Sequence, residues 1–228
     1  LVKGASKGEG LGNQFLANIR ETDAILHVVR CFDDPNIVHV DGSVDPVRDK
    51  EIIDTELQIK DLETIENRIK KVEKQAQTTN DKDAKRLYSI LLRFKEVLLQ
   101  GKSARVVTFD NAEDEKLAKG LFLLTNKPVM YVCNVDEASA ATGNEHVERL
   151  KAAIADEGAE VLVIAAKIES EIAELDSYEE RQMFLEEIGL KQSGVERLIQ
   201  SAYSLLNLQT YFTAGEPEVR AWTINKGD

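Results

Sequence analysis

The sequence predicts an α/β protein organised around a parallel sheet. Three short apolar runs, at residues 24–32, 129–133 and 160–166, are rich in β-branched and aromatic side chains. Runs of this length and composition are typical of strands buried on both faces of a sheet. Helical patterns lie between the three runs, and strands that alternate with helices are typical of parallel sheets.

The composition narrows the possible function classes. The 228 residues carry a formal net charge of −12, which argues against overall attraction to nucleic acid or to an anionic membrane but leaves a local basic surface open. No apolar run reaches membrane-spanning length and no signal peptide is visible. Cys31 and Cys133 are the only cysteines, so we interpret them as core residues of a cytoplasmic protein rather than as a disulfide framework. Three scattered histidines without ligand spacing predict no metal site.

The first 45 residues combine a glycine-rich stretch, a helix and a strand. Residues 1–12 contain four glycines and are expected to be flexible or tightly turned. Residues 13–22 have helical spacing and lead into the apolar run at 24–32. A polar loop follows and carries His39. Taken alone, a loop histidine is more often a surface residue than a catalytic one.

Residues 46–102 predict an inserted antiparallel pair of helices. Asp45 and Pro46 are suited to the N-cap and first turn of a helix that runs to about residue 77. Its apolar residues follow the 3, 4, 3, 4 spacing of a coiled-coil seam: Leu62, Ile65, Ile69, Val72 and Ala76. A polar break at 78–81 precedes a second helix that ends near Gly101, so we expect the two helices to fold back on each other.

This insertion is the one basic part of the chain. Residues 60–102 hold 11 Lys and Arg against 7 Asp and Glu, a balance of +4, which leaves −16 for the rest of the −12 chain. Two interpretations stay open. The charges either belong to ordinary solvated helix faces or form a surface that binds a polyanion such as RNA.

Residues 103–228 continue the α/β pattern. We expect residues 104–109 to be extended and helices at 111–124, 144–157, 177–188 and 194–206. Residues 218–224 alternate like a strand, for which we find no partner strand in the chain. The chain begins without methionine in a glycine-rich loop and stops at a turn signal, so we expect an internal piece of a longer protein.

A candidate ligand site follows the central strand. Asn134, Val135, Asp136 and Glu137 come directly after the apolar run at 129–133. Ligands of open parallel sheets bind at the carboxyl ends of the strands, where these four residues are expected. The motif taken alone is explained at least as well by a helix N-cap after a strand.

Several motifs, read together, resemble the YchF group. This group, also called Obg-like ATPases, belongs to the Obg-related P-loop NTPases of the translation-factor class. The resemblance extends over essentially the whole chain and is carried by residues 3–16, 19–22, 27–32, 134–137, 169–175 and 202–214. It implies an incomplete P-loop NTPase G-domain with a parallel sheet and an inserted antiparallel coiled-coil arm. The implied domains are a G-domain part with switch II at 1–45, the arm at 46–102, the G-domain remainder at 103–208, and a linker with the first strand of a TGS domain at 209–228.

The resemblance also implies the site residues. Guanine-specific relatives carry Asn-Lys-x-Asp, whereas this chain has Asn134, Val135 and Glu137 at the matching positions, which implies a preference for ATP over GTP. Ala165, Ala166 and Lys167 match the last base-contacting loop. His39 matches a mobile-loop histidine that the group is thought to use in catalysis, while His27 matches a structural position.

The sequence also lacks part of the machinery that the resemblance implies. No Gly-x-x-x-x-Gly-Lys-Ser/Thr motif occurs in residues 1–228, so the phosphate cradle and the hydroxyl that holds Mg²⁺ are not in this chain. We therefore expect the parent protein to use ATP or GTP with Mg²⁺, and this piece to be inactive and to bind nucleotide weakly.

The resemblance implies partners too, and it leaves alternatives open. The implied partner is the ribosome or a ribosomal subunit, with RNA contacting the arm. No membrane partner is expected. The strand at 24–32 is expected to have an open edge that favours self-association. The alternatives are a coiled-coil interaction or RNA-binding module on an α/β scaffold, and a GTP-preferring Obg-like GTPase.

Overall fold

The computed structural model describes residues 3–7, 12–78 and 80–227 and divides into two compact units. The first unit comprises Leu1–Asp23 and Lys50–Lys127, and the second comprises Ala24–Asp49 and Pro128–Asp228. Each unit has its own hydrophobic core. The domain boundaries predicted at residues 45, 102 and 208 remain predictions.

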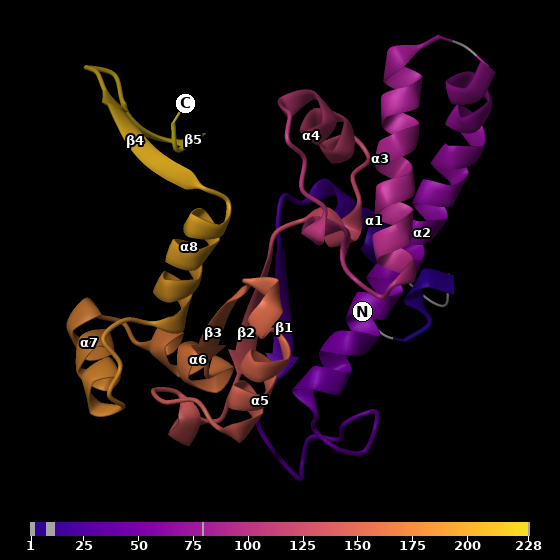
Figure 1. The fold of residues 1–228 in the computed structure, drawn as a ribbon. Coiled ribbons are helices and arrows are strands. Elements are labelled where there is room, and N and C mark those ends of the chain that lie inside the picture. The colour runs from indigo at the N-terminus through magenta and orange to yellow at the C-terminus, as the bar shows by residue number, and fades with distance from the viewer. Residues whose placement is uncertain (1–2, 8–11, 79, 228) are drawn as a thin grey trace. The chain divides into compact units, whose positions relative to one another are not determined.

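The second unit contains the predicted parallel sheet. Its strands are β1 (Ile25–Arg30), β2 (Val129–Asn134) and β3 (Glu160–Ile164), in the order β1-β2-β3 (Figure 1). Both strand pairs are parallel, and Asn134 is in register with Arg30 on one side and with Ile164 on the other. The three strands therefore end at the same carboxyl edge, and the predicted α/β class is confirmed.

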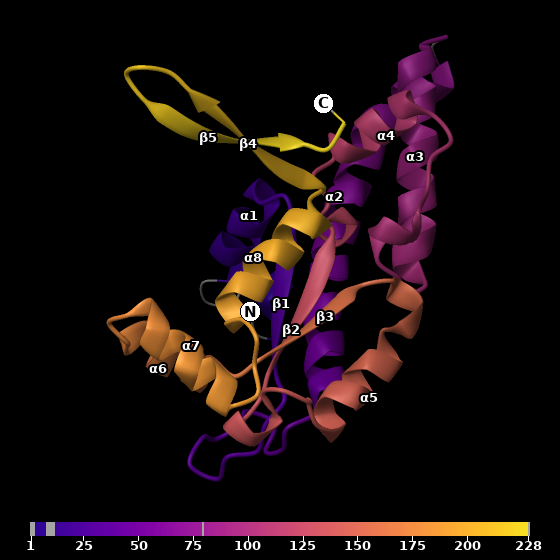
Figure 2. The same ribbon diagram turned by 90° about the vertical axis from the view of Figure 1, so that its left-hand side faces the viewer.

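Helices cover both faces of this sheet. On one face, Tyr131 and Cys133 pack in a core with residues of α5 (Glu145–Ala153), α6 (Ala166–Glu174) and α7 (Tyr178–Glu187). On the other face, Met130 and Val132 pack with Leu198 and Leu205 of α8 (Gly194–Leu205). Figure 2 shows α5 and α8 on opposite sides of the strands. The alternation follows from the two-residue period of a strand, which sends successive side chains to opposite faces.

Burial on both faces was predicted for all three strands and is found for β2 alone. Residues Val129–Cys133 are all buried, whereas Val28 of β1 is 64% exposed and Leu26 is 41% exposed. The reason is that β1 lies at the edge of the described sheet, and no described element of the second unit covers its face with Leu26 and Val28. Self-association through this edge remains a prediction.

The end of the chain corrects one expectation. Residues 218–224 were predicted to lack a partner, but β5 (Val219–Asn225) pairs antiparallel with β4 (Leu208–Ala214). The indole Nε1 of Trp222 also donates to the Thr213 hydroxyl across the pair, at 2.8 Å. The partner was missed because all but one of the β4 residues are exposed, so the run has no alternation of apolar and polar residues to mark it as a strand.

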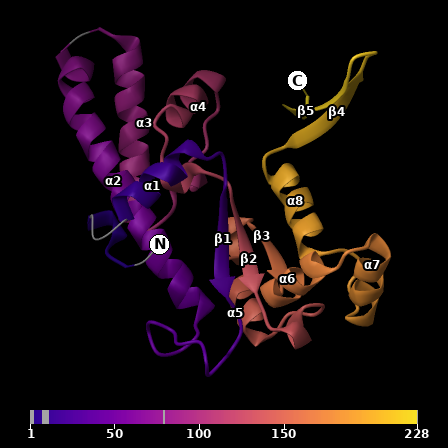
Figure 3. The ribbon, with the colours of Figure 1, turned by 180° about the vertical axis from the view of Figure 1, so that it is seen from behind.

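The first unit is organised by the predicted helix pair. Helices α2 (Pro46–Thr78) and α3 (Lys82–Leu99) run antiparallel and side by side (Figures 1 and 3). Ile65 of the predicted seam is fully buried and packs in one cluster with Leu91 and Phe94 of α3. Asp81 caps α3 by accepting hydrogen bonds from the backbone of residues 83 and 84. The predicted packing of the two helices is thereby confirmed.

One helix in the rest of the first unit is shorter than predicted. Besides α1 (Gly12–Glu21), it contains α4 (Ala112–Lys119), although a helix was expected to continue to Leu124. The helix ends early because Gly120 follows it and Phe122 has a positive φ of 50°. Residues 104–106, expected to be extended, form a 3₁₀ turn, as do residues 124–126. Asp61 of α2 binds the backbone of the second turn.

Within the described residues, no helix is both long enough and apolar enough to cross a bilayer.

Candidate functional site

The candidate site begins at the last residue of β2. The Asn134 side-chain oxygen accepts a hydrogen bond from the backbone N–H of Ala166, at 3.0 Å. Ala166 is the first residue of α6, and the N-cap residue Ala165 has no polar side chain of its own. Asn134 therefore supplies the missing cap from the neighbouring strand, which leaves its Nδ2 amide without a hydrogen bond in the described part of the chain. This contact brings together the two loops that the sequence predicted separately.

Asp136 and Glu137 have different roles, one as an N-cap and the other as a candidate ligand contact. The Asp136 carboxylate accepts from Ser139 N at 2.9 Å and so caps the short 3₁₀ turn at residues 137–139. The N-cap interpretation thus applies to Asp136. Glu137 is exposed, and its carboxylate makes no hydrogen bond or ion pair with another described residue. It remains free to accept a hydrogen bond from a ligand.

Val135 has its side chain buried in the core of the second unit. Its side chain is 4% exposed and packs in the core with Val29 and Leu150, while its N–H donates to the Ile164 carbonyl at 2.9 Å. The buried side chain therefore offers almost no surface to a ligand. A lysine at this position would place an ammonium among apolar side chains.

The loop at residues 165–167 presents one buried and two exposed residues. Ala165 is buried, Ala166 is exposed, and the Lys167 side chain is 79% exposed with its ammonium 3.9 Å from Glu171. An ion pair this long and this exposed holds the lysine only weakly. Lys167 can therefore reorient toward a ligand at the carboxyl edge.

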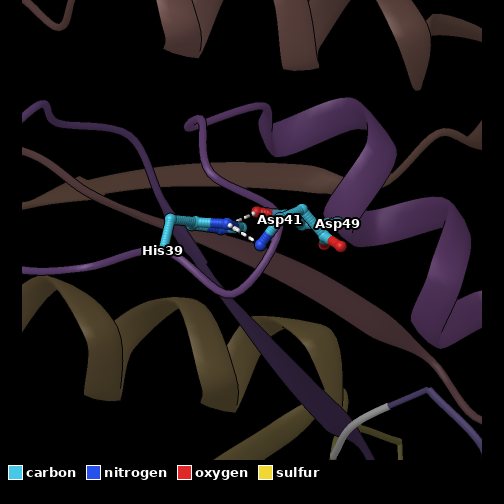
Figure 4. A group of neighbouring side chains, drawn as sticks. All are labelled: His39, Asp41 and Asp49. Carbon is cyan, nitrogen blue, oxygen red and sulfur yellow. Dashed lines mark hydrogen bonds and ion pairs between the residues drawn. The ribbon is translucent and has the colours of Figure 1, made fainter.

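His39 lies in the loop before α2 and is held by two aspartates (Figure 4). Its Nδ1 accepts from the Asp41 backbone N–H at 3.2 Å, and its Nε2 lies 2.8 Å from Asp49 Oδ2. Because Nδ1 is an acceptor, the hydrogen-bond pattern assigns the proton of the neutral ring to Nε2, which donates to Asp49. Both ring nitrogens are therefore engaged.

The same three side chains do not fit a metal. Ligand atoms of His39, Asp41 and Asp49 lie within 4.8 Å of one another. A metal on Nε2 would require a proton on Nδ1, which would then face the Asp41 N–H donor. Arg48 already neutralises the carboxylates, with its guanidinium 3.1 Å from Asp49 and 3.8 Å from Asp41.

Sequence reasoning found His39 and missed its partners. Asp41, Arg48 and Asp49 are ordinary charged residues in a charged stretch, and no spacing marks them as contacts of a histidine. His27 lies on β1 with its ring 5.4 Å from that of Tyr131, which agrees with the structural role expected for it. His146 pairs with Asp33 at 3.0 Å.

This geometry identifies a class of α/β proteins. A parallel sheet covered by helices on both faces, with polar loops meeting at its carboxyl edge, is the architecture of α/β proteins that bind ligands at that edge. Comparison with known proteins then identifies relatives of the chain. No family model matches it, but individual proteins do.

Curated relatives match at high identity over all of it. The chain is 56% identical over 229 residues to the protein named ribosome-binding ATPase YchF of Bacillus subtilis (strain 168) and 49% identical over 227 residues to its namesake in Escherichia coli O157:H7. Among solved structures, that of the Schizosaccharomyces pombe YchF GTPase matches with a TM-score of 0.84 and 33% identity, and the match covers 96% of this chain and 59% of that one. The resemblance to the YchF group is therefore confirmed along the whole chain. The chain spans about three fifths of the length of these curated relatives, 62% and 61%.

Proposed function

We propose that this chain is the base-selecting part of a ribosome-associated enzyme that hydrolyses ATP. The observation that carries the proposal is the hydrogen bond between Asn134 and Ala166, which joins two candidate base-contacting loops at the carboxyl edge of the sheet. The names of the relatives, ribosome-binding ATPase and YchF GTPase, support the same reaction class and a ribosomal partner.

Base choice rests on the free carboxylate of Glu137. Guanine offers two adjacent donors, its ring N1–H and its C2 amino group, which a short aspartate accepts together. Adenine has no N1 hydrogen and offers its C6 amino group. The glutamate is one methylene longer, which moves its oxygens out of register with the guanine pair. We infer that the site prefers ATP, with Asn134 and Lys167 as further contacts.

The test is calorimetric titration of ATP and GTP into the protein extended to the full length of its YchF relatives. We expect ATP to bind at least about 10-fold more tightly, which corresponds to about 1.4 kcal/mol. Glu137→Asp should reduce that ratio severalfold. Glu145→Asp, the same change at an exposed residue of α5, is the matched control. Val135→Lys is avoided because position 135 is buried.

Two results would contradict this assignment. Equal or tighter binding of GTP by the unaltered protein would favour the alternative of a GTP-preferring GTPase. A ratio that is unchanged in Glu137→Asp would show that this carboxylate does not choose the base, even if ATP is preferred.

A second function is favoured by the outer face of α2. Lys70, Lys71 and Lys74 have no carboxylate partner among the described residues, because the nearby acids turn toward α3. Glu66 pairs with Lys95 at 2.9 Å, and Glu73 accepts from the Tyr88 hydroxyl at 3.1 Å. We propose that this lysine face contacts RNA. Replacing the three lysines by glutamine should weaken RNA binding and reduce its salt dependence, and binding that is indifferent to salt would contradict the proposal.

A further inference from the structure

We propose that Asp49 is a positioning residue that restrains His39 and thereby keeps the basal rate of ATP hydrolysis low. The proposal rests on the ATP hydrolysis proposed above and on the catalytic role that the resemblance to the YchF group implies for His39, which we take to be orienting the attacking water. It adds a regulatory contact to that site. The contact is built from residues 37–49, all of which belong to the second unit.

Both ring nitrogens of His39 are engaged in hydrogen bonds. A histidine that orients a water needs a ring nitrogen available to it. His39 has neither, since Nε2 donates to Asp49 at 2.8 Å and Nδ1 accepts from the Asp41 N–H at 3.2 Å. The side chain is also only 17% exposed. In this arrangement His39 cannot act on water.

Asp49 is the fixed partner of the His39–Asp49 pair. It lies in the first turn of α2, where its N–H donates to the Asp45 carbonyl at 3.0 Å. Its other carboxylate oxygen, Oδ1, accepts from Arg48 Nη2 at 3.1 Å and from Nε at 3.2 Å. His39 comes from a loop, so the histidine is the side of the pair that can move.

Two arginines anchor the chain on either side of residues 38–42. Arg30 Nη1 donates to the Ile37 carbonyl at 3.0 Å, and Arg48 Nη2 donates to the Ser43 carbonyl at 2.6 Å. Residues 38–42 lie between these anchors, and Gly42 has a φ of 77° in the turn that follows His39. The five residues can change conformation together while both ends stay in place.

The burial of side chains in this segment is the reverse of the usual pattern, with apolar residues exposed and a polar one mostly buried. Val38 and Val40 are 91% and 95% exposed, while the polar His39 between them is turned inward. Burial of apolar side chains is favourable and their exposure is not. An arrangement that turns the valines inward would rotate His39 outward and break its bond to Asp49. The Asp49 contact is therefore what opposes this rearrangement.

The experiment uses the protein extended to the full length of its YchF relatives. Asp49→Ala removes the restraint, Asp49→Asn weakens it while keeping the helix start intact, and Glu51→Ala is the control on an exposed acid of the same helix. Single-turnover hydrolysis gives the rate, and ¹⁵N NMR of the imidazoles reports the His39 tautomer independently of activity. We expect Asp49→Ala to raise the rate at least about threefold with unchanged ATP affinity, and Asp49→Asn to give a smaller rise. The double variant with His39→Ala should lose the rise.

The other outcomes would each contradict one part of the proposed mechanism. A lower rate in Asp49→Ala would overturn the proposal, because Asp49 would then support His39 in catalysis. An imidazole spectrum of Asp49→Ala identical to that of the unaltered protein would overturn the restraint itself, whatever the rate. A His39 that is released by NMR while the rate stays constant would overturn its regulatory effect. Unaltered hydrolysis in His39→Ala alone would instead refute the catalytic role that the resemblance to the YchF group implies for His39.

Discussion

Replacement of Asp61 by asparagine should destabilise the first unit by about 1–3 kcal/mol, on the basis of the net cost of unsatisfied buried groups. Asp61 of α2 is fully buried, and both of its oxygens are used. Oδ1 accepts from Leu124 N at 2.8 Å, and Oδ2 accepts from Thr125 N at 2.7 Å and from the Thr125 hydroxyl at 2.8 Å. An asparagine has only one side-chain oxygen, and its NH₂ group would take the place of the other carboxylate oxygen. Depending on its orientation, this NH₂ group would face the one donor that binds Oδ1 or the two donors that bind Oδ2.

Two opposing effects set the size of this loss. Burial raises the pKa of Asp61, although the hydrogen bonds from Thr125 and Leu124 oppose that rise. The neutral asparagine escapes the cost of burying a charge. It leaves at least one backbone N–H unsatisfied, however, at about 1–3 kcal/mol, and adds a contact between two donors. The second effect is the larger, because all three acceptor contacts of Asp61 are short and buried.

Urea unfolding followed by circular dichroism measures the change, and hydrogen exchange at the Leu124 and Thr125 amides locates it. Glu63→Gln on the same helix is the matched control, since Glu63 pairs with Lys60 at a surface where its side chain is 54% exposed. Such a pair contributes at most about 1 kcal/mol. A loss in Asp61→Asn no larger than in Glu63→Gln, with slow exchange retained at both amides, would refute the reasoning.

Two further predictions concern the second unit. Asp45 accepts from Val47 N and Arg48 N at the start of α2 and from Arg149 at 2.9 Å, so Asp45→Ala should cost about 1 kcal/mol in urea unfolding, and Asp45→Asn, which preserves the cap, should cost less. Burial alone would raise the pKa of Asp45, but the Arg48 N–H and the Arg149 guanidinium outweigh it and lower the pKa. Its contribution is therefore present above the unfolded value of about 3.9 and should decline as the pH falls below it, so a pH-independent difference from Asp45→Ala would contradict this. Cys31 and Cys133 are both fully buried, and the interaction between the two thiols raises the pKa of Cys31 and lowers that of Cys133. Iodoacetamide should label native Cys133 roughly 100-fold more slowly than unfolded protein if opening costs about 3 kcal/mol, whereas labelling at similar rates would show that the core around it opens freely.

Local patterns determined the elements of this protein. The uncharged run Val129–Cys133 predicted a buried strand, and the 3, 4 spacing from Leu62 to Ala76 predicted a helix packed along one seam. Both signals are periodic in the sequence because one chain segment meets one neighbour on a fixed face. Asp45 was likewise recognisable as a cap, because a cap depends on the two or three residues that follow it.

The contacts of the candidate site were not determined in this way. That Asn134 would cap α6, that Glu137 would stay free and that Val135 would turn into the core depend on the register of β2 against β3. The pairing of β4 with β5 was missed for a related reason, since an exposed hairpin carries no burial pattern.

The sequence by itself thus determined the α/β class, the inserted helix pair and the stretch that carries the candidate site. Only the tertiary structure decided which side chains of that stretch are available to a ligand, and that His39 is held by Asp49 and Asp41. The physical reason is that hydrophobic periodicity is written along the chain, whereas a hydrogen bond between distant residues depends on where several elements end in space.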